Sequence, residues 1–418
     1  MLNFPCRKSS LETAQPRLSV FYAFLAVKFS ARRPDTMNGG VPPGPGRAIV
    51  LPIMMRRNHV LWLLMGFSSL ILAGLASAEN PGTNDPAAQA WSQLQAAAQM
   101  PPPPAAWETS KPTQAQEEAY YHQLSQVAVA AAAKAADFAT QFSGTTNAIA
   151  GKLFQCKMLR LACAYGDTNQ FAPWEATQTA LLKDPGLVEP ARFGVRADVV
   201  TRQRYLLEAD TNATPDRMEQ ELQSLVKDYP GYDRPLQMLL TFAGNDATPE
   251  KARAIVKEIL SLSPTNQETA VKAAGVVRRL DAPGKPLDIK FAALDGRAVD
   301  LSQMKGKVVL VDFWATWCGP CVAEFPKVKA AYEKYHDKGF EIAAISFDFK
   351  EEPLRRFIQK RDVPWAQYFD GKAWSNPYSL QYGICGIPTM WLVDKKGILR
   401  EVNAADDLTA KIEKLLAE

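Results

Sequence analysis

An apolar run that ends at two closely spaced cysteines constrains this 418-residue chain more than any other feature. The segment KVVLVDFWAT (307–316) is almost continuously apolar, which is typical of a strand buried at the centre of a sheet. Cys318 and Cys321 follow it, and we expect a helix to begin at Cys318. A buried strand that leads directly into a helix predicts an α/β unit.

Residues 283–418 continue this alternation of strands and helices. LDIKFAALDGRAVDLSQ (287–303) predicts a β-hairpin that turns at Asp295 and Gly296. Beyond the cysteines we expect strands at 340–348, 388–394 and 398–403, and helices at 351–362 and 406–418. The prediction is an α/β domain with a central mixed sheet and flanking helices.

Residues 113–280 have a helical pattern instead. Apolar residues recur at helical spacing, and the later segments form helix pairs that break at Pro230-Gly231 and at Ser263-Pro264. The turn in LSLSPTNQETAV (260–271) resembles that of a tetratricopeptide-type repeat, and a helical array of that kind usually binds a partner. A plain helical bundle fits the pattern equally well, so we predict an all-α domain of one kind or the other.

The start of the chain has the features of a leader. Residues 54–78 combine a basic pair, an apolar run at 60–76 and an Ala-Ser-Ala cleavage site, as secretory signal peptides do. An uncleaved membrane anchor formed by residues 60–76 is the alternative. Residues 1–53 match neither a domain nor a targeting signal, and we interpret them as a non-native upstream extension. Residues 79–112 are rich in Pro and Ala and are predicted to form a flexible linker.

The positive charge of the chain lies in this leader. Residues 1–57 carry a net charge of +7 while the whole chain carries +4, so the remainder is mildly acidic at −3. A body without a basic stripe argues against nucleic acid as a partner.

Three chemistries compete for a Cys-x-x-Cys pair: zinc binding, haem attachment and disulfide exchange. Zinc needs two further ligands, and residues 283–418 offer only Cys385 and His336. Haem attachment needs a His directly after the second Cys, where Val322 stands. The pattern therefore favours disulfide exchange and no metal. Cys156 and Cys163, seven residues apart on one predicted helix, are interpreted as buried thiols rather than as a metal or redox pair.

The residues around the cysteines resemble a known family. VDFWATWCGPC (311–321) and YGICGIPT (382–389) are similar to thioredoxin. The preceding hairpin, EFP (324–326) and GKAWSNPYSLQYGI (371–384) look like the TlpA/ResA branch of extracytoplasmic thiol-disulfide oxidoreductases. The resemblance covers residues 283–418 and implies a thioredoxin-like fold for them.

The resemblance agrees with the chemistry of a helix N-terminus, where two residues at i and i+3 lie on one face and the helix dipole favours a thiolate on the first. Cys318 is therefore the expected nucleophile and Cys321 the resolving thiol. Asp312 matches the thioredoxin carboxylate that relays the proton of the resolving Cys, although the TlpA/ResA branch more often has Asn there. Glu324 matches a ResA-type active-site glutamate and is a second candidate acid or base, with a solvated helix glutamate as the alternative.

Further residues are expected to receive the substrate. The resemblance makes Trp317 a wall of the active site, next to the dipeptide Gly319-Pro320. It also makes Pro388 a cis-proline whose neighbour Ile387 pairs through its backbone with a bound substrate strand. Cys385 is expected near the rim of the site, accessible to solvent, as a partner in mixed disulfides or an incidental thiol.

These observations predict a secreted, periplasmic or otherwise extracytoplasmic oxidoreductase that reduces protein disulfides through Cys318 and Cys321 and needs no other cofactor. Its expected partners are oxidised client proteins, a membrane thiol reductant and a protein bound by the helical domain. A peroxiredoxin-like peroxidase is one alternative, although the P-x-x-x-T-x-x-C pattern would need Thr at Ala315 and Pro at Val311. The other alternative is a helical-repeat binding protein that carries a redox module.

Overall fold

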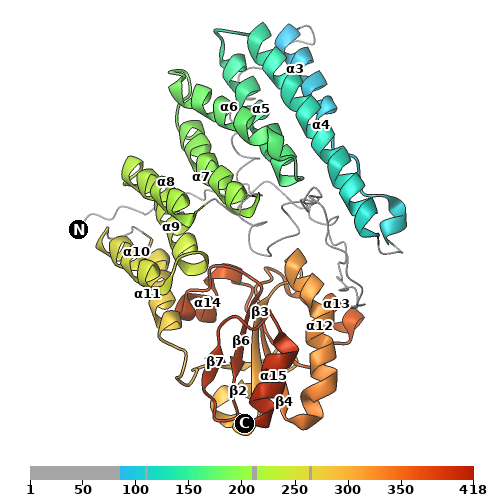
Figure 1. Ribbon diagram of the computed structural model, residues 1–418, viewed down its shortest axis with the longest axis vertical. Helices are drawn as coiled ribbons and strands as arrows, with labels where there is room; N and C mark the ends of the chain where they lie inside the picture. The colour runs from blue at the N-terminus through green and yellow to red at the C-terminus, as the bar shows by residue number, and fades with distance from the viewer. Residues whose placement is uncertain (1–84, 109–111, 210–213, 263–265) are drawn as a thin grey trace, which may run out of the picture.

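The computed structural model describes residues 85–108, 112–209, 214–262 and 266–418 (Figure 1). The predicted upstream extension and signal peptide lie outside these residues. Among the described helices, none has both the length and the hydropathy that crossing a membrane requires.

The apolar run before the cysteines forms the central strand of a five-stranded sheet, and every residue of this strand is buried. On one side of it both successive strand pairings are parallel, and on the other side both successive pairings are antiparallel. In spatial order the strands are β5 (Ala366–Tyr368), β4 (Phe340–Ser346), β3 (Val308–Trp314), β6 (Thr389–Val393) and β7 (Leu399–Glu401). The predicted mixed sheet is thus confirmed, with the predicted buried strand at its centre.

Helices flank this sheet, with α12 against β4 and α15 against β3 (Figure 1). They are α12 (Gly319–Tyr335), α13 (Glu351–Arg361), α14 (Pro377–Tyr382) and α15 (Leu408–Ala417). The predicted hairpin is present as β1 (Lys290–Ala292) and β2 (Ala298–Asp300), and Gly296 supplies the positive φ of 85° that its turn needs. This arrangement is the thioredoxin-like fold that the resemblance implied.

The preceding region is entirely helical within its described residues, and consecutive helices pack against one another. Two apolar clusters hold it together, one mainly among the earlier helices and one mainly among the later. The helices are α3 (Pro86–Ala97), α4 (Gln114–Gln141), α5 (Thr146–Ala164), α6 (Phe171–Lys183), α7 (Ala191–Ala209), α8 (Pro215–Asp228), α9 (Asp233–Asn245), α10 (Pro249–Ser261) and α11 (Gln267–Leu280). Short 3₁₀ turns lie at η1 (Ala105–Glu108), η2 (Thr168–Gln170), η3 (Leu301–Gln303), η4 (His336–Lys338) and η5 (Ala373–Ser375).

The linker prediction for 79–112 is wrong where α3 lies. The Trp91 ring packs 5.4 Å from the Phe138 ring and 5.5 Å from the Phe154 ring, and Leu94 is only 3% exposed. Trp91 and Leu94 are three residues apart, so they share one helix face, and the Ala residues of α3 favour helix. The Pro- and Ala-rich composition concealed this short amphipathic pattern.

The helical region reaches the thioredoxin-like domain through α11, which packs against α14 (Figure 1). The two backbones meet closely at Gly275, where an added Cβ would lie 2.3 Å from the Leu380 carbonyl oxygen and 2.5 Å from the Gly383 nitrogen. The Arg278 guanidinium also donates to the Gln381 carbonyl. The helical region therefore contacts the segment that leads into Pro388.

Candidate active site

Cys318 lies at the N-cap of α12 and forms a disulfide with Cys321. Its Sγ also accepts the Cys321 backbone N–H at 3.1 Å, and Pro320 lies in the first turn, where a missing N–H costs nothing. The two cysteines are 1% and 4% exposed. The partial positive charge of the helix N-terminus favours a thiolate on Cys318 when the disulfide opens.

Asp312 lies on β3, six residues before Cys318, between Ala344 of β4 and Met390 of β6. Its side chain is buried, and among the described residues Oδ1 has no hydrogen-bond partner. Burial raises the pKa of Asp312 to about 7. A carboxyl group with this pKa can take up and release a proton near neutral pH.

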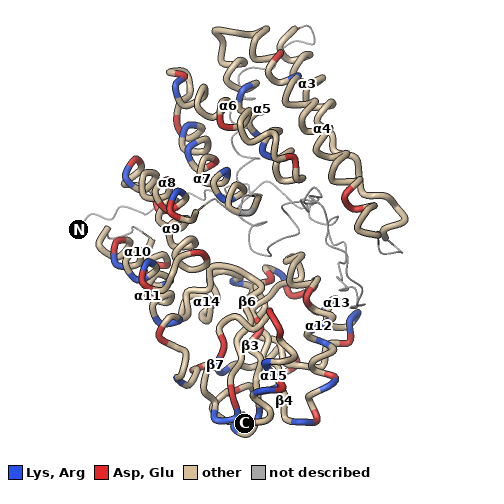
Figure 2. Tube along the Cα trace, in the orientation of Figure 1, with Lys and Arg blue, Asp and Glu red and all other residues tan. Residues whose placement is uncertain are grey.

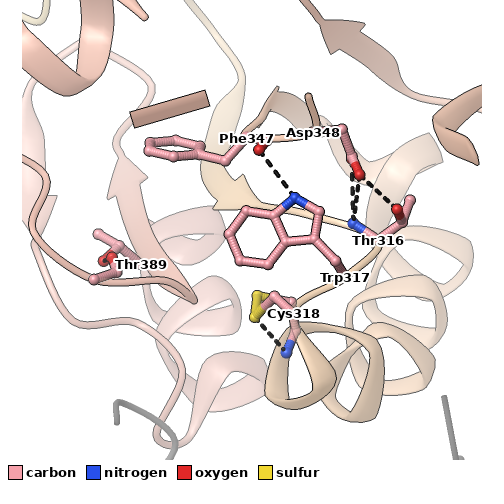
Figure 3. The surroundings of a disulfide bond; sticks show 8 residues. Thr316, Trp317, Cys318, Phe347, Asp348 and Thr389 are labelled. Carbon is pink, nitrogen blue, oxygen red and sulfur yellow. Dashed lines mark hydrogen bonds between the residues drawn. A yellow bond between two sulfur atoms is a disulfide. The ribbon is translucent and has the colours of Figure 1, made fainter. Parts of the chain in front are cut away.

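The residues just before Cys318 are held by the end of β4 (Figure 3). The Asp348 carboxylate accepts the Thr316 backbone N–H at 3.1 Å and the Thr316 hydroxyl, and it accepts the Ser346 hydroxyl at 2.8 Å. The Trp317 indole N–H donates to the Phe347 carbonyl at 3.1 Å. Burial raises the pKa of Asp348, and the bonds from Thr316 and Ser346 oppose that rise.

Trp317 belongs to a partly exposed aromatic surface. Its ring stacks on Phe349 at a centroid distance of 6.0 Å, and Phe349 is 55% exposed. On another side Trp374 lies 6.3 Å away and meets Phe347 edge-on at 5.0 Å. This surface could receive the apolar side chains of a substrate next to the disulfide.

The Ile387–Pro388 peptide is cis, as the resemblance implied. The next residue, Thr389, begins β6, and its hydroxyl donates to the Gly386 carbonyl at 2.7 Å. In the view of Figure 3, Thr389 and Thr316 lie on opposite sides of Cys318. The first residue of β6 thus belongs to the surroundings of the disulfide that Figure 3 draws.

Two of the expected site residues have their side-chain contacts away from the disulfide. Glu324 is one turn further along α12 and pairs with Lys327 at 2.9 Å; within the described chain its carboxylate makes no hydrogen bond to either sulfur of the disulfide. Cys385 is half-buried rather than open, because its Sγ lies against α9, 3.8 Å from the Leu240 carbonyl. Its neighbour in sequence is Gly386, close to the site, but the thiol itself faces the helical region.

Asp348, Phe349 and Trp374 were missed by the sequence analysis. A signal for Asp348 was present, because it lies two residues after the end of β4, the parallel neighbour of the strand that leads to the cysteines. The carboxyl ends of such strands meet at one edge of the sheet, where binding residues gather. Trp374 and Phe349 lie on connections whose approach to Trp317 depends on the tertiary fold.

The part of the chain that the structure describes holds no group of three or more His, Cys, Asp or Glu side chains placed to bind a metal. Cys156 and Cys163 are both buried, as predicted. Burial is the main cause that raises the pKa of the Cys163 thiol to about 12 and that of the Cys156 thiol well above its usual value. Neither thiol is prepared for exchange chemistry.

The C-terminal part of this chain is similar to known proteins. A family model described as Redoxin matches residues 282–416. The "Thiol-disulfide oxidoreductase ResA" of a Bacillus cereus strain is 33% identical over 120 residues, which make up 29% of this chain and 68% of that protein. The chain belongs to the redoxin family of thiol-disulfide oxidoreductases. Residues 282–416 are called the redoxin domain below.

Other relatives match the redoxin domain over similar lengths. The protein of the same name from Bacillus thuringiensis subsp. konkukian is 34% identical over 110 residues, which cover 26% of this chain. The chain spans 62% of the length of that relative. A crystal structure of the thioredoxin domain of a thiol-disulfide oxidoreductase from Bacteroides vulgatus is 35% identical, and the match covers 32% of this chain and 98% of that one with a TM-score of 0.30.

Proposed function

We propose that this protein reduces disulfides of client proteins outside the cytoplasm through the Cys318–Cys321 pair. The observation that carries the proposal is the position of the pair: Cys318 caps α12, and its sulfur accepts the N–H of Cys321. In the reduced protein the same N–H would stabilise the Cys318 thiolate, the form that attacks disulfides.

The reaction begins with the reduced pair. The Cys318 thiolate attacks one sulfur of a client disulfide; a Cys318–client disulfide forms, and the other client sulfur leaves as a thiolate that takes a proton from water. The Cys321 thiolate then attacks the Cys318 sulfur, which forms the Cys318–Cys321 disulfide and releases the second client thiolate. Two electrons pass from the pair to the client, which ends with two thiols.

The second step needs Cys321 to lose its proton. We assign that role to Asp312, whose pKa of about 7 allows its carboxylate to accept the proton and later return it to solvent. The orphaned Asp312 oxygen in an otherwise apolar strand supports this role, because a buried carboxyl without partners costs stability and implies a use.

The composition of the site supports reduction rather than oxidation. Gly319 and Pro320 place no charged or His side chain between the cysteines, and such groups are what over-stabilise the thiolate in strong oxidants. Asp312 works in the same direction, since a carboxylate behind the pair disfavours excess thiolate. The reduced pair would be regenerated by a thiol reductant in the membrane.

The direction is tested by equilibrating the Cys318–Cys321 pair against glutathione. We expect a potential nearer to about −270 mV, the thioredoxin value, than to about −120 mV, the value of a strong oxidant. A value at the oxidant end would overturn the reductase proposal and leave the site assignment intact.

The location is tested separately. The leader at residues 54–78 supports export, and mass spectrometry of the native protein should find an N-terminus near Glu79. Recovery of peptides from residues 1–50 would contradict this.

A further inference from the structure

Helix α11 of the helical region brings a lysine to the aromatic surface of the redoxin domain. The Lys272 ammonium lies 5.3 Å from the centre of the Trp374 ring, and Trp374 in turn lies 6.3 Å from the active-site residue Trp317. Lys272 is half-buried, and burial lowers its pKa from the usual value. Lys272 lies outside the residues that match the redoxin family. It is nevertheless linked to Trp317, the residue before the nucleophile Cys318, through the Trp374 ring.

Lys272 has no ion-pair partner, since no carboxylate of the described residues lies within 4.0 Å of its Nζ. Glu268 is one turn earlier on the same helix, but its carboxylate accepts the Ser375 hydroxyl at 2.8 Å. The Trp374 ring partly compensates the charge of Lys272 through a cation–π contact. A desolvated ammonium of this kind still gains free energy when an anion approaches.

Two further cations, Arg278 and Arg279, lie in the last turn of α11, and Glu268 lies in its first turn (Figure 2). Arg278 donates to the Gln381 carbonyl and Arg279 to the Gly244 carbonyl, so neither guanidinium is paired with a carboxylate at this contact. The face of α11 that meets the redoxin domain therefore carries three cations and one carboxylate, Glu268. Its electrostatic potential favours an acidic ligand.

We propose that Lys272 is a specificity-determining residue of the redoxin site and selects client proteins that carry an acidic side chain near their reactive disulfide. The inference deepens the proposed function and rests on it, because it concerns which disulfides the Cys318–Cys321 pair reduces. An ion pair between Lys272 and the client would form during docking and would speed attack by raising the population of docked client.

The ring contacts that join Lys272 to Trp374 at 5.3 Å and Trp374 to Trp317 at 6.3 Å set the scale of the client segment between the lysine and the disulfide. An extended chain advances about 3.3 Å per residue, so an acidic side chain about three residues from the client cysteine lies roughly 10 Å from it. The partly exposed side chains of Trp317 and Trp374 would support the client segment between these two points. The helical region thereby forms one wall of the client site.

The test compares two synthetic peptide disulfides that differ only in the residues about three positions from the cysteine, Asp in one and Lys in the other. We expect the full chain to reduce the Asp peptide about three- to five-fold faster at low concentration, since partly exposed ion pairs are worth up to about 1 kcal/mol. Lys272→Gln should remove the preference, Lys272→Glu should reverse it, and Lys272→Arg should retain it. The preference should also shrink at high salt.

Lys338→Glu is the matched control, because Lys338 also lies over an aromatic ring, that of Tyr335 at 5.6 Å, at the opposite end of α12. This variant makes the same change in net charge and should keep the wild-type preference. Equal rates for the two peptides in the wild type, or an unchanged preference in Lys272→Glu, would overturn the inference. A wild-type protein that reduces neither peptide nor a small uncharged disulfide would overturn the proposed function itself.

Discussion

The two regions of this protein each contain a pair of cysteines, and only one pair is arranged for chemistry. Cys156 and Cys163 lie inside α5, where burial is the main cause that raises their pKa values. Cys318 and Cys321 lie at the start of α12, where the Cys321 backbone N–H faces the Cys318 sulfur. The position of a cysteine relative to the end of its helix therefore decides whether burial makes it inert or reactive.

One carboxylate in each region shows a similar contrast. Asp198 of the helical region accepts hydrogen bonds from Arg160 at 3.2 Å, Trp174 at 2.9 Å and Gln178 at 3.3 Å. Asp312 of the redoxin domain leaves one oxygen without a partner among the described residues. A carboxylate that satisfies its neighbours stabilises a fold, whereas one left unsatisfied is available to exchange a proton.

Removing the nucleophile tests the first contrast and should have the largest effect. Cys318→Ser is expected to lower the rate of client disulfide reduction by at least about 10³-fold, because a hydroxyl does not form the attacking anion near neutral pH. Cys163→Ala, the matched change in the helical region, should keep the rate within about two-fold. Both rates can be followed by thiol release from an oxidised peptide. Substantial activity in Cys318→Ser would remove this residue from the mechanism.

Asp312→Asn tests the second contrast through the pH dependence of stability. The folded-state pKa of about 7 lies above the usual aspartate value, so the folded protein binds a proton that the unfolded chain releases. The free energy of unfolding of the wild type should therefore be highest below about pH 4 and fall as pH rises to 7, by up to about 4 kcal/mol.

The Asn variant lacks this loss and should exceed the wild type in stability by about 2–4 kcal/mol at pH 8, with little difference near pH 4. Denaturant unfolding of both proteins at the two pH values measures this difference in stability. Asp198→Asn is the counterpart in the helical region and should destabilise by about 2 kcal/mol, since Arg160 and Trp174 lose their charged acceptor. Equal stabilities of the Asp312→Asn variant and the wild type at pH 8 would mean that the carboxyl is not desolvated.

The sequence was most informative where a local pattern determines the geometry. The buried strand, the hairpin at Gly296, the helix that begins after Cys318 and the cis peptide before Pro388 all follow from short segments and the family resemblance. The linker prediction failed because composition outweighed the spacing of Trp91 and Leu94, which form one helix face.

The contacts between distant segments could not be predicted in this way. Asp348 reaches Thr316 because β3 and β4 are adjacent, and Lys272 reaches Trp374 because α11 packs against α14. Cys385 was expected to be accessible to solvent because it precedes Pro388 by three residues, but α9 of the helical region partly covers its thiol. Each of these depends on tertiary packing rather than on a repeating local pattern.

The contact between the two regions can be weakened at one glycine. A Cβ at residue 275 would lie 2.3 Å from the Leu380 carbonyl oxygen, so Gly275→Ala should force α11 away from α14 and cost about 2 kcal/mol or more of the contact. In this variant one region should unfold at a lower denaturant concentration than the other, and proteases should cleave between the two regions faster than in the wild type. Gly231→Ala, where nothing lies within 4 Å, should change stability by no more than about 0.5 kcal/mol. Identical unfolding of Gly275→Ala and the wild type would show that the two regions are not held together at this point.

The smallest expected effect concerns how the redoxin domain positions its nucleophile. Asp348 accepts several hydrogen bonds, as Asp198 does, but those from Thr316 reach a residue only two positions before Cys318, so its loss should change rate more than stability. Burial raises the pKa of Asp348, so Asp348→Asn removes a desolvation cost. The same change weakens the hydrogen bonds from Thr316, and the two effects oppose each other in the free energy of unfolding. We expect reduction of a peptide disulfide to slow about five- to ten-fold, or roughly 1 kcal/mol, with the unfolding free energy changed by less.

Thr316→Val should slow the reduction similarly, and the double variant should lose little more activity than either single variant, because both changes remove the same contact. Additive losses in this double-mutant cycle would show that Asp348 acts on the site by another route.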